Sequence, residues 1–305
     1  MRPKTRDGVQ VQPGLGYISF EAPGGALEER ANGMRGAATA GPPLLYDLGA
    51  AETFRAKAQA LGLDPADSWV GGYVDYEWKM LGAIFQAYGI DLRGLRALEF
   101  GCNFGASSIV MAGLGARVCG VDVDSSAVDL ARCNAARYAR SDVAFRHVAD
   151  TRRLPFGDGE FDFVLCNSVL EYVAADHLGA IVRELHRVLK PGGRLLVTGT
   201  SSRLSPRETH SGRWLVNYLP SGLDRLLGRQ WQRGLSPFLL HGLVRDGFSD
   251  EDAAGGGRCW TAARAAMRGT RSAPFPIRAI AAAARWLKVG PGWLAPNISV
   301  MLKRR

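Results

Sequence analysis

The sequence predicts an α/β protein built on a doubly wound, mostly parallel seven-stranded sheet. Between residues 95 and 199, short apolar runs alternate with longer segments that have helical periodicity. Neighbouring parallel strands need a long return connection, which a crossover helix usually provides. The alternation therefore favours one parallel sheet with helices on its faces, and a last strand expected over residues 297–303 extends it.

The elements expected in this region follow one another along the chain. The strands are 96–100, 116–122, 143–148, 161–166 and 194–199, and the helices between them are 106–114, 126–138 and 178–189. Asp124 or Ser125 stands before the second of these helices, where either side chain can cap the first N–H groups. Pro191, Gly192 and Gly193 follow the third helix and are expected to end it.

Two helices are expected before this region. The first covers residues 51–61, and the second covers 73–88, where apolar residues recur at helical spacing: Tyr73, Tyr76, Met80, Ile84 and Ala87. We expect an irregular or helical N-terminal extension over 1–68 and a main domain over 69–305. The main domain divides into a motif-bearing core, a lid-like insertion and a closing segment, over 95–199, 200–240 and 241–305.

Composition places the chain among ordinary globular proteins. Of its 305 residues, 47% are hydrophobic and 22% are charged, and no apolar run approaches the length that spans a bilayer. The basic N-terminus is not followed by the apolar segment of a secretory signal. The five cysteines are scattered without C-x-x-C spacing, so we expect reduced thiols, no metal site and a cytoplasmic location.

The positive charge belongs to the C-terminal third. Residues 203–305 carry 17 Lys and Arg against 6 Asp and Glu, whereas the first 202 residues have a net charge of −2. A solvated Arg-rich surface explains this, and an anionic partner is the alternative. The segment 276–289 is a basic amphipathic helix, with Ile277, Ile280, Ala284 and Leu287 expected on one face. Such a helix packs on its own domain or makes peripheral contact with an anionic membrane.

A glycine turn follows the first strand of the core. Gly101 and Gly105 permit a tight turn close to a ligand, and Asn103 tolerates the left-handed backbone angles that the middle position requires. Asp122 ends the next strand, 17 residues after Gly105, where a carboxylate can accept hydrogen bonds from both ribose hydroxyls. Glu99 at the mouth of the turn would repel a pyrophosphate but could hold an ammonium group. The pattern therefore suits S-adenosylmethionine better than a nicotinamide dinucleotide.

Five segments in order resemble the motifs of class I S-adenosylmethionine-dependent methyltransferases, with a type 11-like methyltransferase domain. They are residues 97–105, 118–122, 149–156, 161–173 and 186–196. The resemblance implies a Rossmann-like methyltransferase fold with S-adenosyl-L-methionine as cofactor. Two positions depart from the family pattern: Asn103 replaces a frequent glycine, and Tyr172 stands where a histidine is often found.

The resemblance also implies which residues bind the cofactor: Glu99, Gly101, Cys102, Gly105, Asp122, Val123, Asp150, Thr151 and Asn167. Glu99 would orient the methionyl amine, and Asp122 would bind the ribose. Asp150 with the Thr151 backbone would contact the adenine. Asn167 would line the sulfonium side.

The acceptor is expected to be a small molecule or a lipid-like molecule that presents an oxygen, nitrogen or carbon nucleophile. Because a sulfonium is already a good leaving group, positioning supplies much of the rate, and a general base is needed only to remove the acceptor's proton. His210 and Glu171 are the candidates for that base, with His241 as a further one. His210 is preferred because it follows the fifth strand and can reach the carboxyl edge of the sheet.

Two other functions fit the same motifs. One is a non-catalytic regulatory protein that binds S-adenosylmethionine, and the other is a nucleotide-dependent oxidoreductase, which the imperfect glycine spacing disfavours. A nucleic-acid partner is not expected, because no recognisable RNA-binding module is present. The protein is expected to be a monomer or a homodimer.

Overall fold

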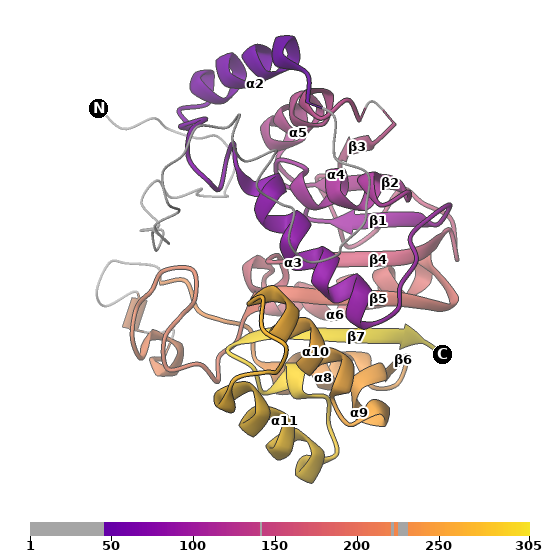
Figure 1. Ribbon diagram of the computed structural model, residues 1–305, viewed down its shortest axis with the longest axis vertical. Coiled ribbons are helices and arrows are strands. Elements are labelled where there is room, and N and C mark those ends of the chain that lie inside the picture. The colour runs from indigo at the N-terminus through magenta and orange to yellow at the C-terminus, as the bar shows by residue number, and fades with distance from the viewer. Residues whose placement is uncertain (1–45, 141, 221–222, 225–230) are drawn as a thin grey trace.

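The computed structural model describes residues 46–140, 142–220, 223–224 and 231–305. Its centre is a seven-stranded sheet with the strand order β3-β2-β1-β4-β5-β7-β6 (Figure 1). The strands are β1 (Arg96–Phe100), β2 (Arg117–Asp122), β3 (Ala144–His147), β4 (Phe161–Asn167), β5 (Leu189–Ser201), β6 (Phe248–Asp250) and β7 (Asn297–Arg304). The first five strands are parallel, and β7 lies antiparallel between β5 and β6. The predicted doubly wound, mostly parallel sheet is confirmed.

Helices cover both faces of the sheet (Figure 1). The first face carries α3 (Tyr73–Ala87), α4 (Ala106–Gly113), α5 (Ser125–Arg137) and α10 (Arg258–Met267). The second face carries α6 (Ala175–Val188) and α8 (Pro237–Val244). Along β4, Phe163 and Leu165 point to the first layer, and Val164 and Cys166 point to the second. All four are buried, as expected for a parallel strand between two helical layers.

The N-terminal part of the described chain packs onto this core through α2 (Leu48–Ala60). Asp47 caps the helix, because its Oδ1 accepts a hydrogen bond of 3.0 Å from the N–H of Ala50. Phe54 is fully buried in a cluster with Leu130 of α5, and the Arg137 guanidinium lies 4.1 Å from the Phe54 ring centroid. The domain boundary at residue 68 stays a prediction, and residues 1–45 of the predicted extension lie outside the described residues.

The predicted helix 178–189 ends within one residue of the observed position, but the strand after it begins earlier than the predicted residue 194. Helix α6 ends at Val188, and β5 begins at Leu189, which pairs with Phe161 of β4. Lys190 precedes Pro191, and the residue before a proline is disfavoured in the helical region. The chain therefore becomes extended before it reaches the proline, rather than at the glycines that follow.

On two helices, the apolar residues that recur at helical spacing are not all buried. Ile84 on α3 is buried, but Tyr76 is 45% exposed. On α11 (Phe275–Leu287), Ile277 and Ala284 are buried, whereas Leu287 is 48% exposed. Both exposed side chains lie at the margin of a helical face, where a shift of one helical position moves a residue from the interior to solvent.

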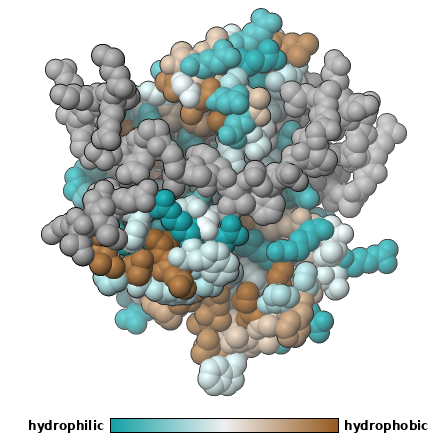
Figure 2. Space-filling view, turned by 90° about the vertical axis from the view of Figure 1, so that its left-hand side faces the viewer, coloured by the Kyte–Doolittle hydropathy of each residue, from teal (hydrophilic) through white to brown (hydrophobic). Residues whose placement is uncertain are grey.

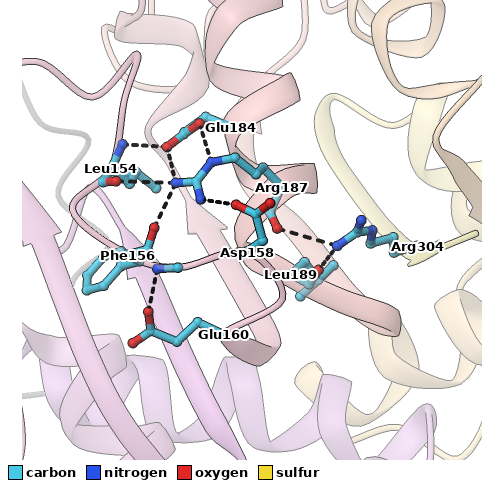
Figure 3. A network of polar contacts seen from close by, with 9 residues as sticks. Leu154, Phe156, Asp158, Glu160, Glu184, Arg187, Leu189 and Arg304 are labelled. Atoms are coloured by element: carbon cyan, nitrogen blue, oxygen red, sulfur yellow. Dashed lines mark hydrogen bonds and ion pairs between the residues drawn. The ribbon is translucent and has the colours of Figure 1, made fainter.

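The loop after β3 is fixed to α6 by one arginine (Figure 3). Arg187 forms ion pairs with Glu184 and Asp158, with N–O distances of 2.6 Å in both cases. Its Nη2 also donates to the carbonyls of Leu154 and Phe156, at 3.3 and 2.9 Å. The hydrogen bonds to the carboxylates of Glu184 and Asp158 raise the pKa of Arg187 further above its usual range. The loop that leads away from the predicted adenine contact is therefore held in one position.

Four smaller elements complete the described chain: the helix α9 (Glu251–Gly255) and the 3-10 turns η1 (Leu170–Tyr172), η2 (Val216–Tyr218) and η3 (Pro291–Trp293). All five cysteines are free thiols. Among the described residues, we find no helix with both the length and the apolar character needed to cross a membrane.

Candidate functional site

The predicted site residues converge at the carboxyl ends of β1, β2 and β4. Glu99 lies near the end of β1, Asp122 is the last residue of β2, and Asn167 is the last residue of β4. Strand β1 lies between β2 and β4, so the chain reverses its direction of winding at this point of the sheet. Ligands of open α/β sheets bind in the crevice at such a switch point.

The loop between β1 and α4 has the backbone that the glycines predicted. Gly101, Asn103 and Gly105 all have positive φ angles, of 76°, 43° and 77°. The prediction that Asn103 tolerates a left-handed conformation is confirmed. Gly105 directly precedes α4, so the free N–H groups of the first helical turn face the same crevice. Gly101 also lies close to the segment after β4, because a Cβ added to it would sit 2.2 Å from Cγ2 of Val169.

Two backbone N–H groups hold the carboxylate of Asp122. Its Oδ2 accepts from Asn103 at 2.8 Å, and its Oδ1 accepts from Asp124 at 3.0 Å. Burial raises the pKa of Asp122 despite these hydrogen bonds. Two ionised oxygens offer about four lone-pair positions, so both can still accept from the hydroxyls of a diol. The side chain of Val123, which comes next, is 54% exposed and offers apolar surface beside that diol site.

Asp150 and Thr151 lie on the loop after β3. The carboxylate of Asp150 is exposed and pairs with Arg152, whose Nε is 2.8 Å from Oδ1. The hydrogen bonds from Arg152 lower the pKa of Asp150 to about 2. An exocyclic amino group would therefore share an ionised carboxylate with Arg152. Thr151 is half-buried beside it.

The Cys102 side chain does not face the crevice. It is 3% exposed and belongs to the hydrophobic core on the α3 and α4 side of the sheet. Burial raises the pKa of its thiol well above the usual range. The prediction that Cys102 binds the cofactor can therefore concern only its backbone, whose N–H donates to Val121.

The floor of the crevice is a buried acidic cluster. Glu99 is 3% exposed, and Ser108 of α4 donates a short hydrogen bond to its Oε2. Burial is the main cause that raises the pKa of Glu99 to about 8, and the nearby Glu77 raises it further. Glu77 is 2% exposed on α3, and burial raises its pKa to about 7.

Sequence reasoning missed Glu77. The signal was present, because Glu77 lies four residues after Tyr73 and seven before Ile84, on the helical face that those apolar residues define. A carboxylate on an apolar face is buried only where polar groups receive it. Those groups come from β4 and α4, which the periodicity of one helix cannot show.

His210 and Glu171 form a pair on the other side of the crevice. His210 Nε2 lies 2.8 Å from Oε1 of Glu171, which also accepts from the N–H of Ser201 at 3.2 Å. The Glu171 side chain is fully buried, and its Oε2 has no hydrogen-bond partner among the described residues. Burial lowers the pKa of His210, but the hydrogen bond and the charge of Glu171 outweigh it, so the pKa is raised.

His210 lies beside Tyr172, the position at which the fourth-strand motif often has a histidine. The ring of Tyr172 lies next to the His210 ring, with centroids 5.8 Å apart. The predicted insertion therefore brings an imidazole to the position beside Tyr172. His241, the third candidate base, instead packs on Trp293 with centroids 5.1 Å apart, and no hydrogen bond joins it to Glu171 in the described part of the chain.

Comparison with known proteins identifies the region that carries the site. Residues 98–197 match a family model described as a methyltransferase domain. The chain is 32% identical over 135 residues to a ubiquinone biosynthesis O-methyltransferase of Maricaulis maris. This match covers 43% of this chain and 52% of that protein. It is 30% identical over 103 residues to a sterol 4-C-methyltransferase of Caenorhabditis elegans, which covers 34% of this chain and 30% of that protein. The chain spans about half the length of the first curated relatives that it matches.

Among solved structures, the chain is similar to an S-adenosylmethionine-dependent methyltransferase from Mesorhizobium loti. The TM-score is 0.48 at 20% sequence identity, and the match covers 76% of this chain and all of that one.

We expect Gly101→Ala to destabilise the protein more than Gly89→Ala does. Both glycines have positive φ, 76° and 60°, so an L-residue costs about 1–2 kcal/mol at either position. Only at Gly101 does the new Cβ meet another side chain, and such overpacking adds about 1–3 kcal/mol. Urea denaturation of the two variants measures the difference. Equal free energies of unfolding would show that Val169 does not crowd Gly101.

Proposed function

We propose that this chain, whose residues 98–197 match a model of a methyltransferase domain, is a class I S-adenosylmethionine-dependent methyltransferase that transfers a methyl group to a small-molecule or lipid-like acceptor. One observation carries the proposal. The switch point of the sheet joins a buried carboxylate at Glu99, a diol acceptor at Asp122 and a left-handed loop that ends in a helix N-terminus. An ammonium, a ribose and a carboxylate are the three polar groups that this arrangement matches, and S-adenosylmethionine carries all three.

The residues present fit that cofactor. Glu99 would pair with the methionyl ammonium, and the N–H groups at the start of α4 would face the methionyl carboxylate. Asp122 would accept from both ribose hydroxyls, and Asp150 would contact the adenine. When bound, the sulfonium supplies a methyl group with a good leaving group already attached, so the chain's own task is to orient the acceptor.

For the acceptor, the pair of His210 and Glu171 supports a general base. His210 would take the proton of the acceptor as the acceptor atom bonds to the methyl carbon and the carbon–sulfur bond breaks. Glu171 would stabilise the imidazolium that forms, because its carboxylate is buried and already accepts from the ring. The curated relatives include an O-methyltransferase and a C-methyltransferase, and both reaction types remove a proton from the acceptor. The comparisons lend no support to a regulatory protein or an oxidoreductase.

We also propose a cytoplasmic protein that makes peripheral contact with membranes through α11. Phe275 and Trp286 are 79% and 82% exposed, although both are large and apolar. They stand eleven residues apart on α11, which is three helical turns, so they share one outer face. This face is opposite to the one that the periodicity predicted, because Ile277 and Ala284 pack inward.

The charge around this face suits an anionic surface. Arg278, Arg285 and Lys288 are exposed on or next to α11, and residues 268–290 contain no Asp or Glu. Hydrophobic side chains also gather on the lower part of the surface in Figure 2, toward the end of the molecule where Figure 1 shows α11. Aromatic anchors flanked by cations are typical of helices that lie in a bilayer interface.

The cofactor assignment is tested by isothermal titration. We expect S-adenosylhomocysteine to bind the unaltered protein and NAD to produce no binding heat. Asp122→Asn should weaken S-adenosylhomocysteine by about 10- to 100-fold, because hydrogen bonds to a charged group contribute about 1.5–3 kcal/mol. The control Asp129→Asn removes an equal charge from α5, where the carboxylate is half-exposed and pairs with Arg132, and should leave the affinity unchanged. Equal affinities for both variants would contradict the ribose contact.

The interaction between Glu171 and His210 is tested by measuring the pKa of His210. Glu171→Gln should lower the pKa of His210, because it removes the charge that raises it. The imidazole signals in an NMR pH titration measure this pKa. His186, in the last turn of α6, has a pKa that burial lowers, and it serves as a control whose pKa should not change.

The same pair predicts a kinetic effect. His210→Gln should slow transfer of a labelled methyl group to the acceptor fraction of a cell extract by about 100-fold, and S-adenosylhomocysteine should still bind. In the unaltered protein, the rate should rise as the pH increases through the raised pKa of His210, because only the neutral imidazole accepts a proton. A variant with undiminished transfer would exclude His210 as the base.

Membrane contact is tested with vesicles of phosphatidylserine and phosphatidylcholine, and with vesicles of phosphatidylcholine alone. We expect sedimentation with the anionic vesicles only, weakened by salt, and loss of most binding in the double variant Phe275→Ser and Trp286→Ser. Trp214→Ser removes a Trp that is 68% exposed elsewhere and should bind normally. Binding that ignores both lipid charge and salt would rule out this surface.

A further inference from the structure

Glu77 reaches the floor of the crevice from outside the motif-bearing core. It lies on the second turn of α3, and its carboxylate is buried against hydrogen-bond donors from three elements. The side chains of Tyr73 on the same helix, Ser107 of α4 and Asn167 at the end of β4 lie beside the carboxylate and partly offset the effect of burial on its pKa. Asn167 Nδ2 and Ser107 Oγ are themselves 3.1 Å apart, so these polar groups form one connected cluster.

Glu99 belongs to the same cluster. Ser107 contacts Glu99 as well as Glu77, and each carboxylate is almost completely buried. The two glutamates repel each other, and neither forms an ion pair with a Lys, Arg or His among the described residues. Burying one carboxylate without a cation is costly, and burying two together is more so. A bound cation would remove both costs.

We propose that Glu77 is a second carboxylate of the cofactor site and holds the methionyl ammonium together with Glu99. This inference rests on the proposed function and assigns to that site a residue that lies outside residues 98–197. An ammonium has three N–H donors, which can be shared among two carboxylates and the amide oxygen of Asn167. Glu77 is thus a cofactor-binding residue in this proposal.

The pair also couples cofactor binding to protons. Burial raises the pKa of Glu77 to about 7, and burial together with repulsion from Glu77 raises that of Glu99 to about 8, so both carboxyls are partly protonated near neutral pH in the free protein. A cation favours the ionised forms, and binding therefore releases protons. The affinity for the ligand with the ammonium group should rise between about pH 6 and about pH 8. At the higher pH the two carboxyls are already ionised, so binding no longer has to displace their protons.

Among the described residues, the pKa of His210 is also raised, and Glu77→Gln leaves that histidine in place, so the difference between the two proteins reports on the glutamate pair. The titratable groups around the pair are Tyr73 on α3, Cys102 after β1 and Cys166 on β4. Burial raises the pKa of all three, so they remain neutral throughout.

The test compares two ligands that differ in the amino-acid part. S-adenosylhomocysteine carries the ammonium, whereas 5′-methylthioadenosine has the same adenosine and lacks it. We expect Glu77→Gln to weaken S-adenosylhomocysteine by about 10- to 100-fold and to leave 5′-methylthioadenosine unchanged, which also shows that the variant is folded. Asp75→Asn makes the same charge change on the exposed side of α3 and should affect neither ligand.

Proton release gives a second measurement, from titrations in buffers of different ionisation enthalpy. The unaltered protein should release protons at about pH 7, and Glu77→Gln should release fewer. If S-adenosylhomocysteine does not bind the unaltered protein, the proposed function itself fails. If it binds and Glu77→Gln matches Asp75→Asn in affinity and proton release, the role of Glu77 is wrong. Heat from magnesium chloride alone that Glu77→Gln abolishes would replace the ammonium site with a metal site.

Discussion

The structure depends on the burial of β1 and β4 between two layers of helices. Because both faces of these strands are covered, their side chains are apolar almost throughout, and polar residues are tolerated only near the strand ends. The parallel pairing of β1 with β4 then places those ends at one edge. Glu99 and Asn167 both lie near that edge, where Ser107 of α4 interacts with each of them.

Several features that are unfavourable for the stability of the fold lie at the same edge of the sheet. Left-handed backbone at Asn103, a close approach at Gly101 and two buried carboxylates all lie within one crevice. Each is destabilising in isolation, and strain of this kind persists where the surrounding structure enforces it. The two packed helical layers provide that enforcement. A cationic ligand with a diol would relieve the electrostatic part of the cost, so stability and binding share the same residues.

Sequence reasoning succeeded where a local pattern decides the structure. Strand β1 and the left-handed loop after it follow from an apolar run and from residues that tolerate positive φ, so their positions were predictable. Sequence reasoning failed where contacts between distant segments decide the structure. The burial of Glu77 depends on Ser107 and Asn167, and the exposure of Leu287 depends on how α11 rotates on its neighbours. The early start of β5 depends on pairing between Leu189 and Phe161, which lies across the intervening helix α6.

This contrast separates the donor side of the site, where we propose that the cofactor binds, from the acceptor side, where we propose that the methyl acceptor binds. The donor side is formed by strand ends and the turns that follow them, so short motifs describe most of it. The acceptor side depends on His210 and Glu171, which are 39 residues apart and joined by a hydrogen bond between the predicted insertion and the turn after β4. Tyr172 stands where the motif often has a histidine, and the imidazole of His210 lies beside it from another segment. The proposed base therefore depends on a contact between distant segments, which no short motif describes.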